Sequence, residues 1–158
     1  MTVPIAKAPP GFNRWDELHA LLMASFAYMD GRIDPPSSLL RMDPQALADK
    51  ARSETLLLAT DRERIVGCLF LRADQDALYA GKLAVEPSVR GQGIARRLFE
   101  VAEEEARRAG LAFLELQTRI ELTENHQTFA RLGFVKTAVT AHAGYARPTS
   151  ITMRRPVA

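Results

Sequence analysis

A glycine-punctuated turn next to several arginines is the part of the sequence whose residue types could bind a ligand. Residues 90–93 read Arg-Gly-Gln-Gly, and apolar residues then recur every three or four positions, which predicts a helix over 94–109. Arg96 and Arg97 fall in the first turn of that helix, where the dipole and the unpaired amides are already positive. Glycines allow successive N–H groups to curl around an anion. The pattern therefore predicts a phosphate-bearing ligand, while a solvated helix start with arginines paired to carboxylates stays open.

The strands upstream must position this turn. Residues 79–85 form a short apolar run, and Pro87 ends it because proline cannot donate to a sheet ladder. Two earlier apolar runs, 56–59 and 65–71, flank the polar turn 61–64, which predicts a hairpin. A further polar turn joins this hairpin to the third run, so we expect an antiparallel meander that leads into the glycine turn.

The other elements follow from capping and periodicity signals. Asn13 can cap one helix, Asp43 before Pro44 a second, and Thr123 or Asn125 a third. The strand after the central helix is reached by a crossover, which makes it parallel to the strand at 79–85. The expected elements are strands at 3–7, 111–116, 134–140 and 150–154, and helices at 13–29, 44–52 and 124–133.

Composition restricts the class of protein. The 158 residues suit a single domain, 1–158, and 47% hydrophobic with 25% charged residues is ordinary for a globular protein. A net charge of +2 with dispersed basic residues argues against nucleic acid as a partner. No apolar run approaches the ~18 residues of a membrane span, and no signal peptide is visible, so we expect no membrane partner and a cytoplasmic location. No metal is expected, because no histidines recur at a ligand spacing.

The order of elements separates the classes of phosphate ligand. A nucleoside-triphosphate loop needs Gly-Lys-Ser/Thr at the helix start, but Gly93 is followed by Ile94 and Ala95. A dinucleotide fingerprint needs a small residue where Arg96 stands, and it normally opens a βαβ unit instead of following an antiparallel meander. Both nucleotide interpretations are therefore weak.

The sequence resembles a known family in two segments. Residues 83–95, Leu-Ala-Val-Glu-Pro-Ser-Val-Arg-Gly-Gln-Gly-Ile-Ala, resemble the acyl-coenzyme-A-binding signature of the GNAT superfamily of N-acetyltransferases, Arg/Gln-x-x-Gly-x-Gly/Ala. Residues 125–134 resemble the Asn-x-x-x-Tyr-x-x-x-Gly-Phe segment of that family. The resemblance spans about residues 54–153. It implies an α/β (α+β) fold with a mixed, mostly antiparallel sheet of six to seven strands, a splayed parallel pair formed by strands four and five, and about four helices.

The resemblance implies an N-acetyltransferase that moves an acetyl group from acetyl-coenzyme A, its acyl-donor cosubstrate, directly to a primary amine. The acceptor is then a small-molecule amine or a protein amino group, and a homodimer is among the assemblies it allows. A non-catalytic acyl-coenzyme-A-binding or regulatory module is the alternative. Backbone N–H near Val85 would polarise the thioester carbonyl. The residues implied to contact the cofactor are Leu83, Ala84, Val85, Arg90, Gly91, Gln92, Gly93, Ile94, Ala95, Arg96, Asn125 and Phe129.

The sequence departs from the family at the catalytic acid. Many members carry a tyrosine where this chain has Phe129, which has no proton to give. Tyr145 could replace that acid, and Tyr79 on the fourth strand could order a water, although packing is the preferred interpretation of both residues. Coenzyme A leaves readily as a thiolate, so loss of the acid need not abolish transfer. Glu121, just after the fifth strand, remains open as a substrate contact.

Overall fold

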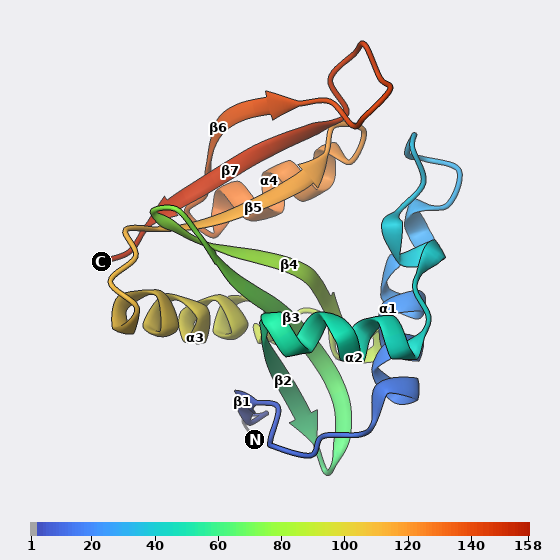
Figure 1. Ribbon diagram of the computed structural model, residues 1–158, viewed down its shortest axis with the longest axis vertical. Helices are drawn as coiled ribbons and strands as arrows, with labels where there is room; N and C mark the ends of the chain where they lie inside the picture. The colour runs from blue at the N-terminus through green and yellow to red at the C-terminus, as the bar shows by residue number, and fades with distance from the viewer. Residues whose placement is uncertain (1–2) are drawn as a thin grey trace.

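The computed structural model describes residues 3–158, in which a seven-stranded sheet carries helices on both faces (Figure 1). The strands are β1 (Ile5–Lys7), β2 (Thr55–Asp61), β3 (Arg64–Asp74), β4 (Ala77–Val85), β5 (Phe113–Arg119), β6 (Val135–Thr140) and β7 (Ser150–Pro156). The helices are α1 (Trp15–Phe26), α2 (Pro44–Ser53), α3 (Ile94–Arg108) and α4 (Thr123–Arg131), with short 3-10 helices η1 (Ala27–Met29), η2 (Ser38–Arg41) and η3 (Pro87–Val89).

The predicted fold class is confirmed. The strands lie in the order β1-β2-β3-β4-β5-β7-β6, and every neighbouring pair is antiparallel except β4 and β5. Helix α3 makes the crossover between these two parallel strands, as expected. No helix within residues 3–158 is long and apolar enough to cross a membrane.

One of the three predicted helix caps is confirmed. The Asp43 carboxylate accepts a hydrogen bond from the backbone N–H of Ala46 at 2.8 Å, and Pro44 opens α2. Helix α1 instead has Arg14 at the N-cap, and α4 has Leu122, with no side-chain capping bond at either. The predictions for Asn13 and for Thr123 or Asn125 were therefore wrong. Packing against the core stabilises these helices without a local cap: α1 buries Leu18, Leu21 and Leu22, and α4 contributes the partly buried Phe129.

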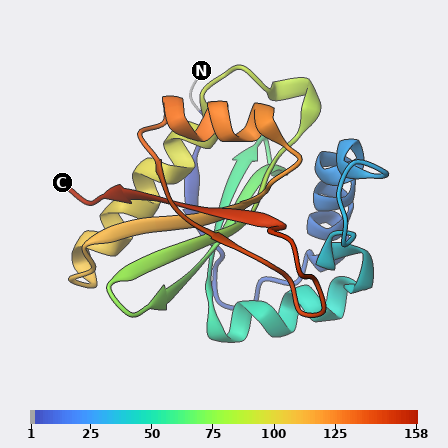
Figure 2. The same cartoon turned by 90° about the horizontal axis from the view of Figure 1, so that it is seen from above.

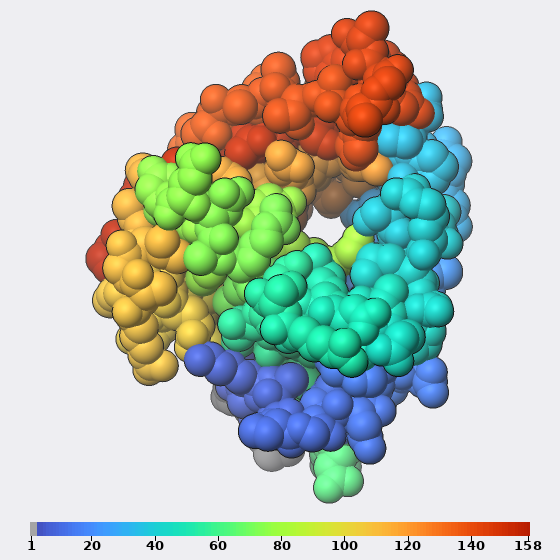
Figure 3. Space-filling view, viewed as in Figure 1, coloured from blue at the N-terminus to red at the C-terminus, as the bar shows by residue number. Residues whose placement is uncertain are grey.

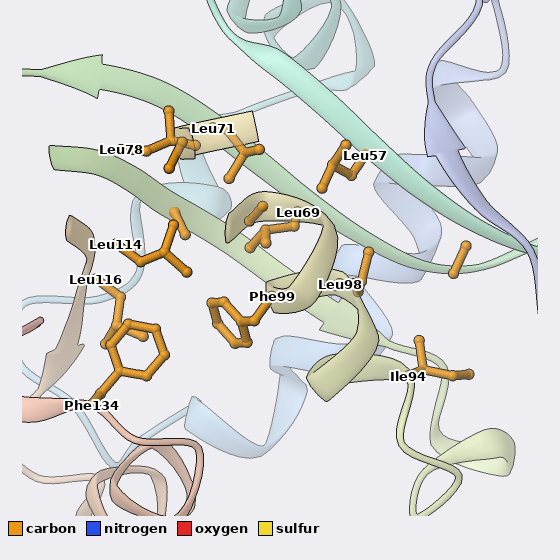
Figure 4. Close-up of a cluster of buried hydrophobic side chains, with 14 of the residues drawn as sticks. Leu57, Leu69, Leu71, Leu78, Ile94, Leu98, Phe99, Leu114, Leu116 and Phe134 are labelled. Atoms are coloured by element: carbon orange, nitrogen blue, oxygen red, sulfur yellow. The ribbon is translucent and has the colours of Figure 1, made fainter. Parts of the chain in front are cut away.

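Alternation along the central strands divides the apolar side chains between two cores. On one face, the α3 stripe of Ile94, Leu98 and Phe99 packs against β3, β4 and β5 (Figure 4). On the other face, α1 and α2 cover residues such as Phe70 and Ala84. Figure 2 shows α3 and α4 on one side of the sheet and α2 on the other. The glycine turn before α3 and the segment between α1 and α2 therefore approach β4 from opposite faces.

The Glu17 carboxylate links α1 to the start of β3 through a hydrogen bond. Glu17 Oε2 accepts a hydrogen bond from the buried Ile65 N–H at 2.9 Å, and Arg14 Nη2 lies 2.7 Å from Glu17 Oε1. Partial burial raises the pKa of Glu17, but the bonds from Ile65 and Arg14 outweigh it and lower that pKa below its ordinary value. A carboxylate with a depressed folded pKa stabilises the fold above its unfolded pKa and loses that contribution as pH falls.

Replacing Glu17 by Ala is expected to lower the free energy of unfolding by about 1 kcal/mol at pH 7, since the Ile65 amide loses its acceptor and the site is partly exposed. Urea titrations across pH measure it. The difference between the native chain and Glu17→Ala should persist above pH 4.5, the ordinary pKa of a glutamate, and shrink below it. A difference that stays constant down to pH 2 would contradict this assignment.

Candidate functional site

The parallel strands β4 and β5 separate along their length. They pair only from Ala77 opposite Phe113 to Tyr79 opposite Glu115, and beyond that point no ladder pair joins them within residues 3–158. The gap opens into a cavity of about 960 Å³. Figure 3 shows its opening between the cyan and teal residues that follow α1 and the orange residues of the later strands. The splay predicted for this pair is therefore present, and it exposes main-chain groups of β4.

The glycine turn forms one end of this cavity. Gly91 and Gly93 have left-handed φ angles of +83° and +78°, and both line the cavity. A Cβ built on either glycine would meet no protein atom within 4 Å, so the space in front of the backbone is open. Gly93 is the N-cap of α3, whose first N–H groups lack intrahelical acceptors. The turn thus has the shape and polarity of an anion site.

The arginines around the turn divide into two kinds. Arg90 donates to the Val85 carbonyl at 3.3 Å and to the Ser25 hydroxyl at 3.3 Å, while Arg97 donates to the carbonyl of Val3. Arg96 is exposed, and within residues 3–158 no ion pair involves it. Two of the basic residues therefore hold the turn in place through main-chain or hydroxyl oxygens, and the alternative of arginines paired to carboxylates was wrong.

Most residues predicted to contact a cofactor are brought together at the cavity wall. Ala84, Gln92 and Arg96 are not among them. The Ala84 side chain is buried in the core beneath α1 and α2, and the other two are exposed to solvent. The predicted residues that line the cavity are Leu83, Val85, Arg90, Gly91, Gly93, Ile94, Ala95, Asn125 and Phe129.

A bulge in β4 adds a residue that the sequence analysis missed. The register against β3 shifts between Cys68, opposite Ala84, and Phe70, opposite Gly81, so β4 contains one extra residue. Lys82 has a left-handed φ of +54° there, and its ammonium donates to Ser38 Oγ at 2.7 Å. If the side chains of β4 alternated strictly between the two faces of the sheet, Lys82 would lie on the same face as Ala84. The sequence pattern does not reveal that β4 contains an extra residue here. A lysine inside an apolar strand was the one available signal.

The two predicted catalytic tyrosines line the cavity on different walls. The Arg72 guanidinium lies over the Tyr79 ring at 4.2 Å, and burial raises the pKa of Tyr79. Tyr145 donates to Asp34 Oδ1 at 2.6 Å, and this hydrogen bond raises the pKa of Tyr145. Asp34 also pairs with Arg147 at 2.9 Å. Both hydroxyls therefore stay protonated at neutral pH.

Phe129 lies where the cavity meets the α3 core. Its ring packs edge-to-face against Phe99 and Phe134, with centroid separations of 6.2 and 6.3 Å. Asn125, one turn earlier, donates to the Tyr28 hydroxyl at 2.8 Å. These contacts position an apolar side chain and an amide on the wall that α4 contributes.

The segment between α1 and α2 forms a further wall of the cavity and is joined to β5 and α4. Arg119 donates to the carbonyls of Pro35 and Pro36 at 2.5 and 3.1 Å. Arg32 lies 2.6 Å from Glu124, and this arginine lowers the pKa of Glu124 to about 2. Glu121, which the sequence left open, accepts from the Asp34 N–H at 3.1 Å and does not line the cavity. Glu121 and Glu124 therefore hold the segment between α1 and α2 in place.

Comparisons with known proteins agree with this architecture. The sequence matches the family described as "Acetyltransferase (GNAT) family" over residues 15–134. It is 31% identical over 129 residues to an IAA acetyltransferase of Azospirillum brasilense, covering 80% of this chain and 82% of the relative. It is 43% identical over 53 residues to an aminoalkylphosphonate N-acetyltransferase of Salmonella typhimurium, covering 34% of each. The PaiA N-acetyltransferase of Thermoplasma acidophilum, solved in complex with coenzyme A, superposes with a TM-score of 0.78 at 14% identity over 99% of both chains.

Proposed function

The chain belongs to the acetyltransferase (GNAT) family, and we propose that it transfers an acetyl group from acetyl-coenzyme A directly to the primary amine of a small molecule. One observation carries the proposal: the gap between β4 and β5 and the glycine turn at α3 line a single cavity. An extended ligand with a phosphate-bearing end fits that combination. The name of the aminoalkylphosphonate N-acetyltransferase supports a small-molecule acceptor.

The residues present suit coenzyme A. The open space in front of Gly91 and Gly93 would receive the pyrophosphate, with the first N–H groups of α3 and the exposed Arg96 adding positive charge. Beyond Tyr79, β4 has no strand partner on the β5 side, so its main chain can bond the amides of the pantetheine arm. Asn125 would contact that arm from α4.

When bound, acetyl-coenzyme A supplies an acetyl group activated as a thioester. The chain's own groups position it, and the Val85 backbone N–H would polarise the carbonyl. The acceptor must attack as a neutral amine, although an alkyl ammonium has a pKa near ~10.4. Tyr79, buried against Arg72, would order a water that removes the proton. Tyr145, held by Asp34, would return a proton to the departing thiolate.

Thiol release from acetyl-coenzyme A with a panel of primary amines tests the proposal, together with calorimetric titration of coenzyme A. We expect saturable binding and amine-dependent release. Binding without release for any amine would favour the non-catalytic module, and the absence of coenzyme A binding would overturn both functions.

Replacing Tyr145 by Phe is expected to lower kcat by about 10-fold. The effect is below the usual range for a general acid because a thiol of pKa ~8.5 leaves readily as its thiolate. Initial rates at saturating acetyl-coenzyme A measure it. Arg147→Gln is the matched control, since it removes the other partner of Asp34 and keeps the hydroxyl. Adding Phe129→Tyr to Tyr145→Phe should restore part of the rate, and an unchanged kcat in Tyr145→Phe would remove this residue from the mechanism.

A further inference from the structure

Three cationic side chains from separate elements line the cavity, and the charges of Arg41 and Arg119 both act on Lys82. Arg41 ends η2, Lys82 lies at the bulge of β4, and Arg119 ends β5. The hydrogen bonds of Lys82 and Arg119 go to uncharged oxygens: Lys82 donates to Ser38 Oγ, and Arg119 donates to the carbonyls of Pro35 and Pro36. Across residues 3–158, none of the three takes part in an ion pair. Their charges therefore stay uncompensated by carboxylates at bonding distance.

The acidic groups near the cluster are committed elsewhere. Glu54 lies 2.8 Å from Lys50, Asp34 pairs with Arg147, and Glu124 pairs with Arg32. Glu121 acts on Arg119 from beyond ion-pair distance while accepting from the Asp34 N–H. None of these acids forms an ion pair with the cluster.

The neighbouring cations add to the effect of burial in disfavouring the charged form of Lys82. Burial lowers the pKa of Lys82 to about 8, and the charges of Lys50, Arg119 and Arg41 contribute in the same direction. Burial, followed by the charge of Arg119, likewise lowers the pKa of His142 on the β6–β7 loop. A bound anion would relieve this repulsion.

The cluster is separate from the anion site proposed for the cofactor. The glycine turn continues into α3, which packs on one face of the sheet, whereas Lys82 bonds to Ser38 in the segment between α1 and α2 on the other. Unused donors remain, because a lysine has three N–H donors and an arginine five, and Lys82 and Arg119 use one and two of them. An oxyanion is the ligand that such donors recognise.

We propose that the acceptor is a small amine that also carries an oxyanion, a carboxylate or a phosphonate, which Arg41, Lys82 and Arg119 bind. The inference rests on the proposed acetyl transfer and narrows its substrate class. Because Lys82 and Arg119 lie on the two strands that border the gap between β4 and β5, an oxyanion bound there would hold the amine of the same molecule within the cavity. A neutral or polycationic amine would lack that anchor.

Matched amines test the proposal. Initial rates of thiol release would compare β-alanine with β-alaninamide, and 2-aminoethylphosphonate with ethanolamine. We expect kcat/KM to be at least about 10-fold higher for the anionic member of one pair or both, because charge-assisted hydrogen bonds discriminate strongly. The two pairs also distinguish a carboxylate from a phosphonate. Equal values within both pairs, or a preference for the neutral members, would overturn the inference and leave acetyl transfer standing.

Variants and a binding measurement separate the two proposals. Arg41→Gln and Lys82→Met should each lower the ratio of kcat/KM for the anionic amine to kcat/KM for the neutral amine by about 10-fold, and Lys82→Arg should retain most of that ratio. Arg52→Gln is the control: Arg52 is an exposed cation on α2 that pairs with Asp49, and its replacement should leave the ratio unchanged. Calorimetry with N-acetyl-β-alanine and coenzyme-A-saturated protein should show binding that Arg41→Gln weakens. Such binding without turnover of any amine would support the oxyanion site and overturn the proposed reaction. The absence of both binding and anion preference would overturn the inference.

Discussion

Replacing Gly91 by Asp is expected to weaken coenzyme A binding by about 100-fold, equivalent to about 2.7 kcal/mol. Two effects add. The left-handed φ of +83° strains any L side chain, and the new carboxylate would project into the open space where the pyrophosphate would lie. Calorimetric titration of coenzyme A at constant ionic strength measures the change in Kd, and an unchanged Kd would remove the glycine turn from the binding site.

Two control variants separate the charge from the strain. Gly11 has a similar φ of +79°, has no protein atom within 4 Å of a built Cβ, and does not line the cavity. Gly11→Asp should therefore lower stability to a similar extent and leave the Kd for coenzyme A unaltered. Gly91→Ala keeps the strain without the charge, so its Kd should lie between those of the native chain and Gly91→Asp.

The glycine turn could be predicted because its signals are local. A left-handed residue before a helix needs glycine, and an apolar stripe with spacings of three and four can only be a helix face. Both properties depend on neighbours within a few positions, so α3 and the glycine turn that opens it followed from the sequence. The parallel placement of β5 also followed, because a helix crossover returns the chain to the end of the sheet at which the preceding strand began.

The acceptor side of the cavity could not be predicted, because its contacts are long-range. Lys82 meets Ser38, 44 positions away in sequence, and Arg119 meets Pro35, 84 positions away. The bulge that turns Lys82 toward Ser38 depends on an inserted residue that strict alternation does not reveal. The bond from Arg90 to Ser25 was missed for the same reason, since Ser25 lies 65 positions away on α1. Local patterns thus identified the turn proposed for the donor, whereas tertiary contacts assemble the wall proposed for the acceptor.

Phe99 belongs both to the hydrophobic core and to the cavity wall, so the stability of the fold and the shape of the site depend on the same side chain. Phe99 is 1% exposed, lines the cavity, and packs edge-to-face against Phe134 and Phe129 with centroid separations of 5.1 and 6.2 Å. Its ring lies on α3, so it joins the helix that begins at the glycine turn to the helix that carries Asn125. Removing the ring would leave a void between them.

Phe99→Ala is therefore expected to lower the free energy of unfolding by about 3–5 kcal/mol, the range for deleting a buried aromatic side chain. Urea unfolding with an unchanged m value measures the loss. Phe99→Leu retains part of the volume and should cost less, while Val135→Ala, at a position 65% exposed on β6, should change stability by less than about 0.5 kcal/mol. A loss below about 1 kcal/mol in Phe99→Ala would mean that α4 is held without this ring. In that case the contacts of Arg32 with Glu124 and of Asn125 with Tyr28 would have to supply the attachment.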